Sequence, residues 1–341
     1  MILSKEYTPQ ELDELDAKTI QFHNVLFSQE ISNEGIEEIA NILCTTTNEE
    51  RQIIRSKYKK ANNHSIQMDI KTQLEEKYPL LKEISIDMFD TPFEYDAREL
   101  NKILSVMGAD EDIIIEIFST RPKYYLDIID LAYRGFYNVS LKEEIQNQFQ
   151  KEFAQYLLAI MESDRPKEVT ISENEAYIIA NEIDNNGYMA YCNDVGLFKK
   201  TFLEKSRLDL ILISRAFYEK KERNLYDIFK EENIIQKSLF DEMEEEKKLR
   251  NKNLKLIKAL LFGVIAPAQL FAKKCFGALS GFKSDVRTLF RILINRAEID
   301  IQQIRDYYFK EANCDLPKDI ENEINCRENP EIGKILTSFF Q

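Results

Sequence analysis

Apolar residues along the chain recur at spacings of three and four, which is the period of an amphipathic helix. Ile113, Ile114, Ile117 and Phe118 show the pattern, because this spacing places them on one stripe that can face a core. Helix-breaking residues are few, with nine Gly and eight Pro in 341 residues. Long stretches rich in Glu, Lys, Leu, Ile and Ala favour helices over strands. The pattern predicts an all-α chain.

One unit of this pattern occurs twice in closely similar form. Residues 108–121 and 283–296 each set an acidic helix start, an apolar run and a final Arg at the same offsets. A second helical stretch follows each of them, and then a short polar break ends at a Leu, Leu141 in one case and Leu316 in the other. A fixed order of helices that recurs in this way is the mark of a repeat protein.

The same frame fits two further stretches of the chain. Residues 34–66 match it with Thr46 at the position of the final Arg, and residues 193–225 match it more loosely with Lys205 there. The sequence therefore predicts four units, each with the same order of amphipathic helices joined by short connections.

The charge of the chain limits its partners. It has 60 acidic and 46 basic residues, a net charge of −14. This balance argues against nucleic-acid binding, which needs a basic footprint. It also disfavours unaided binding to anionic lipid, because the overall field is repulsive. A bridging divalent cation would remove that objection.

Cysteine use and hydropathy predict a cytoplasmic protein. The five Cys are scattered and none forms a Cys-x-x-Cys pair, so free thiols are expected rather than disulfides or a zinc site. The acidic start of the chain has no long apolar run and does not resemble a signal peptide. The most apolar segment, 259–266, is far shorter than the roughly 20 residues that span a bilayer. No transmembrane segment is expected.

Signals of catalysis are weak. The two His residues, His23 and His64, have no nucleophile beside them in the sequence, and acidic pairs such as Glu37 and Glu38 are typical of exposed helix faces. No Gly-rich phosphate-binding loop is present. We therefore expect a binding protein and not an enzyme.

Several motifs resemble those of one family. The segment from Asp96 to Arg121, with Gly108-Ala109-Asp110 and Ser119-Thr120-Arg121, resembles the second repeat of an annexin. Residues 141–145 followed by 153–160 continue that resemblance, and residues 291–305 are similar to an annexin fourth repeat. The likeness extends from about Phe22 to the end. The eroded loops described below are similar to those of the divergent protist annexins called α-giardins.

The resemblance implies four repeats of about five helices each, packed into a curved disc. The repeat boundaries that it implies are a short N-terminal segment 1–20, then 21–90, 91–165, 166–265 with an insertion near 233–252, and 266–341. Arg121 and Arg296 stand where annexins carry buried arginines that tie helices together.

The resemblance also implies that the convex face binds Ca²⁺ and thereby acidic phospholipid. Ca²⁺ is a hard cation that takes about 6–8 oxygen ligands. In annexins, backbone carbonyls come from a Gly-x-Gly-Thr turn between the first two helices of a repeat, and an Asp or Glu about forty residues downstream completes the site. Glycine permits the positive φ that such a turn needs.

This sequence departs from the annexin pattern in every repeat. Repeat one has Ile31-Ser32-Asn33-Glu34 at the turn and Gln73 at the carboxylate position, so both halves of the site are lost. Repeat two has lost the first Gly of its turn at 106–109, and Gln148 replaces its carboxylate. A neutral amide oxygen should bind Ca²⁺ much more weakly than a carboxylate does.

Repeats three and four keep more of the pattern, and repeat four is the better candidate. Lys283 stands in place of its second Gly, but a carbonyl ligand does not depend on the side chain. The candidate metal ligands are Gly187, Ala190, Cys192 and Glu232 in repeat three, and Leu279, Gly281, Lys283 and Glu323 in repeat four. Glu232 and Glu323 could instead be solvated acids near helix ends, which are common.

The insertion near 233–252 carries several acids from 241 to 246, followed by Lys247 and Lys248. A solvated helix with i, i+4 pairs such as Glu244–Lys248 explains this pattern. An acidic projection for a protein partner, or a second cation site, would have the same composition.

Two functions remain open. The first is calcium-dependent docking to acidic phospholipid membranes, which the net charge favours because an acidic protein needs cations to approach anionic lipid. The second is a calcium-independent scaffold that binds cytoskeletal or other protein partners. In either case we expect a cytoplasmic protein peripheral to membrane or cytoskeleton.

Overall fold

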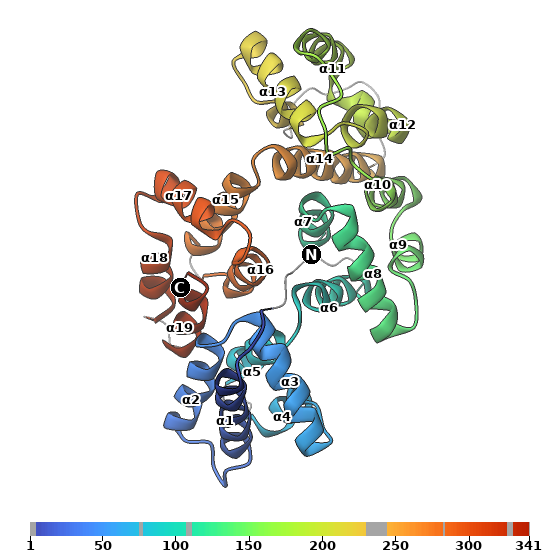
Figure 1. Cartoon of the computed structure of the whole chain (residues 1–341). Coiled ribbons are helices and arrows are strands. Elements are labelled where there is room, and N and C mark those ends of the chain that lie inside the picture. Colours follow the sequence, from blue (N-terminus) through green and yellow to red (C-terminus); the bar gives the residue numbers. More distant parts are fainter. Residues whose placement is uncertain are drawn as a thin grey trace. The chain divides into compact units, whose positions relative to one another are not determined.

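The fold is entirely helical over the part of the chain that is described. A computed structural model describes residues 5–74, 78–106, 111–229, 244–281, 284–325 and 330–340. These residues form nineteen α-helices, one π-helix and one 3-10 helix, with no strand among them (Figure 1). The predicted all-α class is confirmed.

The chain divides into two compact units. The first consists of Met1–Tyr95 and Ala268–Gln341, and the second of Asp96–Pro267. Helices that lie in the first unit are α1 (Pro9–Leu26), α2 (Asn33–Cys44), α3 (Asn48–Asn62), α4 (Ile66–Gln73), α5 (Pro79–Met88), α15 (Pro267–Leu279, from its second residue), α16 (Val286–Arg296), α17 (Ile301–Ala312), α18 (Leu316–Asn325) and α19 (Pro330–Ser338).

The second unit begins inside α6 (Pro92–Leu104). It continues with α7 (Asp112–Thr120), α8 (Lys123–Tyr137), α9 (Leu141–Gln148), α10 (Lys151–Glu162), α11 (Glu173–Asn193), α12 (Val195–Phe198), the π-helix η1 (Lys199–Leu203), α13 (Arg207–Lys221), the 3-10 helix η2 (Leu225–Phe229) and α14 (Glu244–Ile265).

A left-handed residue recurs at equivalent places along the chain. Four residues other than Gly have a positive φ among those described, and each caps the C-terminus of a long helix: Asn63, Asn138, Glu222 and Asn313 end α3, α8, α13 and α17. Asn tolerates this conformation better than most residues. The recurrence gives four groups of helices in the same order, while the exact repeat boundaries stay a prediction.

Helix starts follow the sequence signals for N-caps. Complete capping boxes begin five helices, with Thr8, Thr47, Ser140, Ser172 and Ser206 as the capping residues. In each box the capping hydroxyl accepts a backbone hydrogen bond while an acid three residues later accepts one in return. These local bonds fix where the helices begin, and thereby how long the connecting loops are.

Each unit has a core of its own. In the first unit, Phe22 and Phe89 meet edge to face with ring centroids 5.4 Å apart, and Tyr95 meets Phe290 in the same way at 5.6 Å. In the second unit, α14 packs against α7 and η2, and α11 packs against α13. Burial of these apolar faces is the dominant favourable term in folding.

Arginine side chains tie helix ends together in all four groups. Arg121 and Arg296, which were predicted to be structural, pair with Asp96 and Asp300. In the first group Thr46 stands at the position of the final Arg, and the buried Arg51 donates to the carbonyl oxygen of Thr46 instead. Burial lowers the pKa of Arg51 to about 10.

In the third group, where Lys205 stands at this position, the arginine comes from outside the repeat pattern. Arg165 lies on the connection between α10 and α11 and donates to the carbonyl oxygens of Phe202 at 2.8 Å and Lys205 at 2.5 Å. Burial lowers its pKa to about 10 as well. A cationic donor at the end of a helix satisfies carbonyls that have no partner within the helix.

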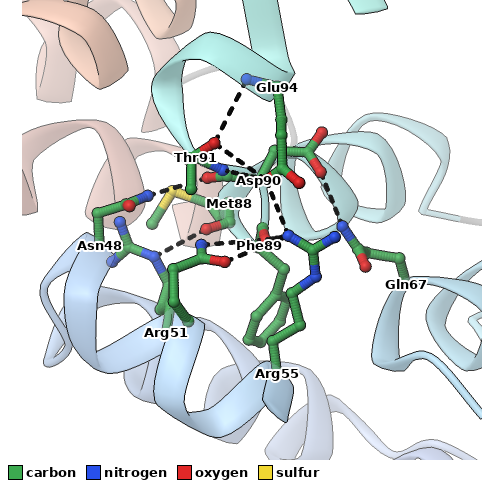
Figure 2. Close-up of polar contacts among 10 residues, drawn as sticks. Asn48, Arg51, Arg55, Gln67, Met88, Phe89, Asp90, Thr91 and Glu94 are labelled. Atoms are coloured by element: carbon green, nitrogen blue, oxygen red, sulfur yellow. Dashed lines mark hydrogen bonds and ion pairs between the residues drawn. The ribbon is translucent and has the colours of Figure 1, made fainter. Parts of the chain in front are cut away.

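The C-terminal end of α5 also has its free carbonyl groups bound by side-chain donors of another helix (Figure 2). Side chains of α3 donate to the carbonyls that α5 leaves open: Arg51 Nε to Met88 at 2.8 Å, and Gln52 Nε2 and Arg55 Nη1 to Phe89 at 3.2 Å each. Arg55 also pairs with Glu94 of α6 at 2.8 Å. One helix thereby sets the path of the chain from α5 into α6.

Candidate calcium site

The loop that the sequence predicts as the best candidate calcium site lies between α15 and α16. The backbone N–H of Asp285 donates to the carbonyl of Ala278 at 2.8 Å, which closes the loop on itself. The Asp285 carboxylate then caps α16 by accepting from the N–H of Thr288 at 3.0 Å. Leu279 is buried at the end of α15, whereas Gly281 is exposed in the loop. Lys283 lies outside the described residues.

The acid predicted for this loop is Glu323. It stands two residues before the end of α18 and is half-buried. Among the described residues, no group of three or more His, Cys, Asp or Glu is placed to hold a metal ion. A cation bound here would therefore depend on backbone carbonyls and one carboxylate. Oxygen donors of this kind suit Ca²⁺.

The predicted turn of repeat three begins with a sharp kink at Gly187. Its φ of 68° and ψ of 162° interrupt α11, which continues on both sides. This conformation is open essentially to Gly alone. The kink redirects the chain so that residues 188–193 form the last part of α11 before the Asp194 cap of α12.

Two predicted ligands of repeat three already have partners. The carbonyl of Ala190 accepts from the N–H of Asp194 at 3.1 Å, and the carbonyl of Cys192 accepts from Asn253 Nδ2 of α14 at 2.9 Å. The Cys192 side chain is buried, and burial raises the pKa of its thiol to about 12, so it stays protonated. Glu232 lies outside the described residues, and the repeat-three site stays a prediction.

Repeats one and two are the repeats in which the sequence predicts that calcium ligands are lost. Ser32 is the N-cap of α2, with its hydroxyl accepting from the N–H of Gly35 at 3.2 Å. Gln73 and Gln148 are the last residues of α4 and α9, and both side chains are exposed. The helices α4 and α9 correspond to α18, the helix that carries Glu323 in repeat four. Residues 107–110 of the second loop lie outside the described residues.

The acidic insertion is described only in part. Residues 230–243 lie outside the described residues, and α14 begins at Glu244. Lys252, at the end of the predicted insertion, pairs with Glu111 at 2.5 Å. The next residue, Asn253, is buried and binds Cys192. Sequence reasoning missed this Asn because it stands among polar residues of a helical pattern, which are typical of an exposed face.

Comparisons with known proteins agree with this helical arrangement. A family model described as Annexin matches residues 95–160 and 270–325. Annexin A13 of Mus musculus is 28% identical over 276 residues, covering 80% of this chain and 80% of its own length. Annexin A3 of Homo sapiens is 27% identical over 311 residues, covering 91% and 88%. These matches support an annexin-family assignment for the chain.

Solved annexin structures share the fold. Chicken annexin V in complex with Zn²⁺ superimposes with a TM-score of 0.80 at 18% identity, covering 98% of this chain and 96% of that one. The calcium-bound structure of alpha-14 giardin superimposes with a TM-score of 0.70 at 14% identity, covering 96% and 99%. Annexins as a family bind phospholipid with calcium. Within the described residues, no helix is long and apolar enough to cross a membrane.

Proposed function

We propose that this annexin-family chain binds acidic phospholipid membranes in a calcium-dependent manner, with the ion held in repeat four. The loop between α15 and α16 carries the proposal, because the Asp285–Ala278 bond closes it while Gly281 remains exposed. The carbonyls of Leu279, Gly281 and Lys283 and the carboxylate of Glu323 would hold the ion. Bound Ca²⁺ would supply the positive charge that bridges an acidic protein to anionic lipid.

A single charged ligand implies weak binding. Sites with few charged ligands have Kd values of about 10⁻⁴ to 10⁻³ M. The neutral Gln73 and Gln148 in repeats one and two support the view that most sites are degenerate. Repeat three would contribute less than repeat four, because the Cys192 carbonyl is already bound by Asn253.

The test is sedimentation with liposomes of phosphatidylserine and phosphatidylcholine, or of phosphatidylcholine alone, across a calcium titration. Glu323→Gln should remove most calcium-dependent binding to the acidic liposomes. Glu321→Gln is the matched control, since Glu321 is an exposed acid two residues earlier on α18. If both variants sediment as the parent protein does, repeat four does not hold the ion.

A scaffold function is the second candidate. It is supported by the loss of the carboxylate in two repeats and by the bound Cys192 carbonyl. In this case the chain would bind cytoskeletal or other protein partners without calcium. If calcium does not change the sedimentation of the parent protein with either kind of liposome, this function is favoured over membrane docking.

A further inference from the structure

An open depression lies between α1 and α2, beside the loop that joins them. Its volume is about 650 Å³, within the range of about 300–1,000 Å³ that is typical of ligand pockets. The helices α1 and α2 run next to each other in the first unit (Figure 1). The depression uses no residue of the proposed calcium site.

Apolar and acidic side chains both line the depression, and we call them its floor and its rim. Ala17 and Ile20 of α1 line it together with Val25, and Ile20 is 61% exposed. The rim consists of three acids, Glu30 in the loop and Glu34 and Glu38 of α2. Among the described residues, no Lys, Arg or His lines it. The charged side chains described in its lining are therefore all negative.

The three acids are not neutralised by the described part of the chain. No Lys or Arg among the described residues forms an ion pair with Glu30, Glu34 or Glu38. Glu38 accepts a hydrogen bond from the neutral Gln21. Hydrogen bonds from its own N–H and from Ser32 hold the pKa of Glu34 below its usual range, so this acid is ionised at neutral pH. A partner molecule with positive charge would pair with these acids.

The volume of the depression and its apolar floor indicate which kind of positively charged partner would fit. A single metal ion would leave most of 650 Å³ empty and Ile20 exposed, given that one water occupies about 30 Å³ in the liquid. A segment with both a basic and an apolar side chain would bury Ile20 and pair with the rim. We propose that this depression binds a basic segment of a partner protein, with Lys or Arg against the acidic rim and an apolar side chain over Ile20.

Other occupants fit less well. A second copy of this chain carries a net charge of −14 and would be repelled as a whole. Acidic phospholipid headgroups would meet the acids of the rim with like charge. The proposal is independent of calcium, so it can fail while the membrane function holds, and the reverse is also true.

The test uses a fluorescein-labelled peptide of Lys and Leu at helical spacing, with a Glu and Leu peptide as the charge-reversed probe. Fluorescence anisotropy without calcium should show saturable binding of the Lys peptide alone. The double variant Glu34→Gln/Glu38→Gln should weaken this binding about tenfold or more. The matched control is Glu14→Gln/Glu37→Gln, which makes the same change at exposed acids of α1 and α2 outside the depression. It should change the Kd less than about twofold.

A second variant tests the cavity itself, and does so even if loss of Glu34 disturbs the start of α2. Ala17→Trp should fill the depression and abolish binding while the circular dichroism spectrum stays unchanged. Equal weakening by both double variants would show that only the bulk charge attracts the peptide, which overturns the proposal. No binding of the Lys peptide to the parent, or full binding to Ala17→Trp, would overturn it as well. So would displacement of the peptide by calcium alone at about 1 mM, a concentration typical of weak sites.

Discussion

The guanidinium of Arg121 donates two hydrogen bonds to the carboxylate of Asp96, Nε to Oδ2 at 2.7 Å and Nη2 to Oδ1 at 3.2 Å. Both side chains are almost fully buried. The attraction between the two charges therefore has to offset the free-energy cost of removing each of them from water. Burial lowers the pKa of Arg121, but the charge of Asp96 outweighs it and leaves the pKa above its usual value. The pair joins the end of α7 to α6 within the second unit.

Arg121→Met should therefore destabilise the protein strongly, because it leaves the Asp96 carboxylate buried without its partner. Breaking a buried pair on one side costs about 3–5 kcal/mol. Arg134→Met is the control, since Arg134 is exposed and pairs with Asp130 four residues earlier on α8, and such helix pairs contribute about 0.3–0.5 kcal/mol. Urea unfolding followed by circular dichroism measures both. Similar losses for the two variants would contradict the structural role given to Arg121.

Asp209 should make the second unit sensitive to acid. It is fully buried and accepts from the N–H of Thr170 at 2.9 Å, the hydroxyl of Thr170 at 2.7 Å and the N–H of Ser206 at 2.9 Å. Burial alone would raise its pKa, but these hydrogen bonds to the carboxylate outweigh burial and lower the pKa below that of an ordinary Asp.

The sign of the effect follows from linkage. A carboxylate with a lowered pKa in the folded state stabilises the protein fully above the unfolded pKa of about 3.9, and this contribution is lost as the pH falls through the folded value. Asp209→Asn should lower the free energy of unfolding at pH 7 by about 1–3 kcal/mol. It should also flatten the decline below about pH 4. Urea unfolding at pH 7, 5, 4 and 3 compares the slopes, and parallel slopes for parent and variant would exclude this role.

Gly187 should be intolerant of any side chain for conformational reasons alone. Its φ of 68° and ψ of 162° belong to Gly, yet a Cβ added there would meet no atom within 4 Å. Gly187→Ala should thus cost about 1–3 kcal/mol of backbone strain. Gly135→Ala in α8 is a matched control, because a Cβ there also meets nothing within 4 Å. That control should stabilise the protein by about 0.5–1 kcal/mol. Thermal unfolding of both variants should give shifts of opposite sign.

The sequence predicted the helical fold because its signals are local. Periodic apolar residues, capping boxes such as that of Thr47, and the polar break after Asn138 each specify a helix or its end within a few residues. The structural role of Arg121, which the resemblance to annexins implied, was also correct, because this residue forms a buried pair with Asp96.

Features that depend on distant parts of the chain could not be predicted in this way. Arg165 replaces a missing arginine from a connection about forty residues earlier, and Asn253 reaches the Cys192 carbonyl across 61 residues. Nothing in their immediate sequence marks either contact. The depression between α1 and α2 also escaped notice, since it arises from the way two helices lie together. The calcium ligands stay predictions for a similar reason, because their carbonyls depend on loop conformation and not on residue type.

The contact between α14 and α7 should fail if Gly263 acquires a side chain. An added Cβ would stand 2.8 Å from the carbonyl oxygen of Ser119 and 3.0 Å from Thr120 Cγ2. The first neighbour is backbone and cannot move without shifting α7, so Gly263→Ala should destabilise the protein by about 1–3 kcal/mol. Gly277→Ala in α15, which meets nothing within 4 Å, should be neutral or stabilising.

Hydrogen exchange can tell whether this loss is local. If α14 and α7 separate, amides of α7 should exchange faster in Gly263→Ala, while those of α2 and α3 in the first unit should keep their protection. The exchange pattern matters because Asn253, ten residues before Gly263 on α14, also holds the Cys192 carbonyl. Displacing α14 should therefore also speed exchange near the end of α11. A variant that is as stable as the parent, with unchanged exchange in α7 and α11, would show that the two helices do not need the close approach at Gly263.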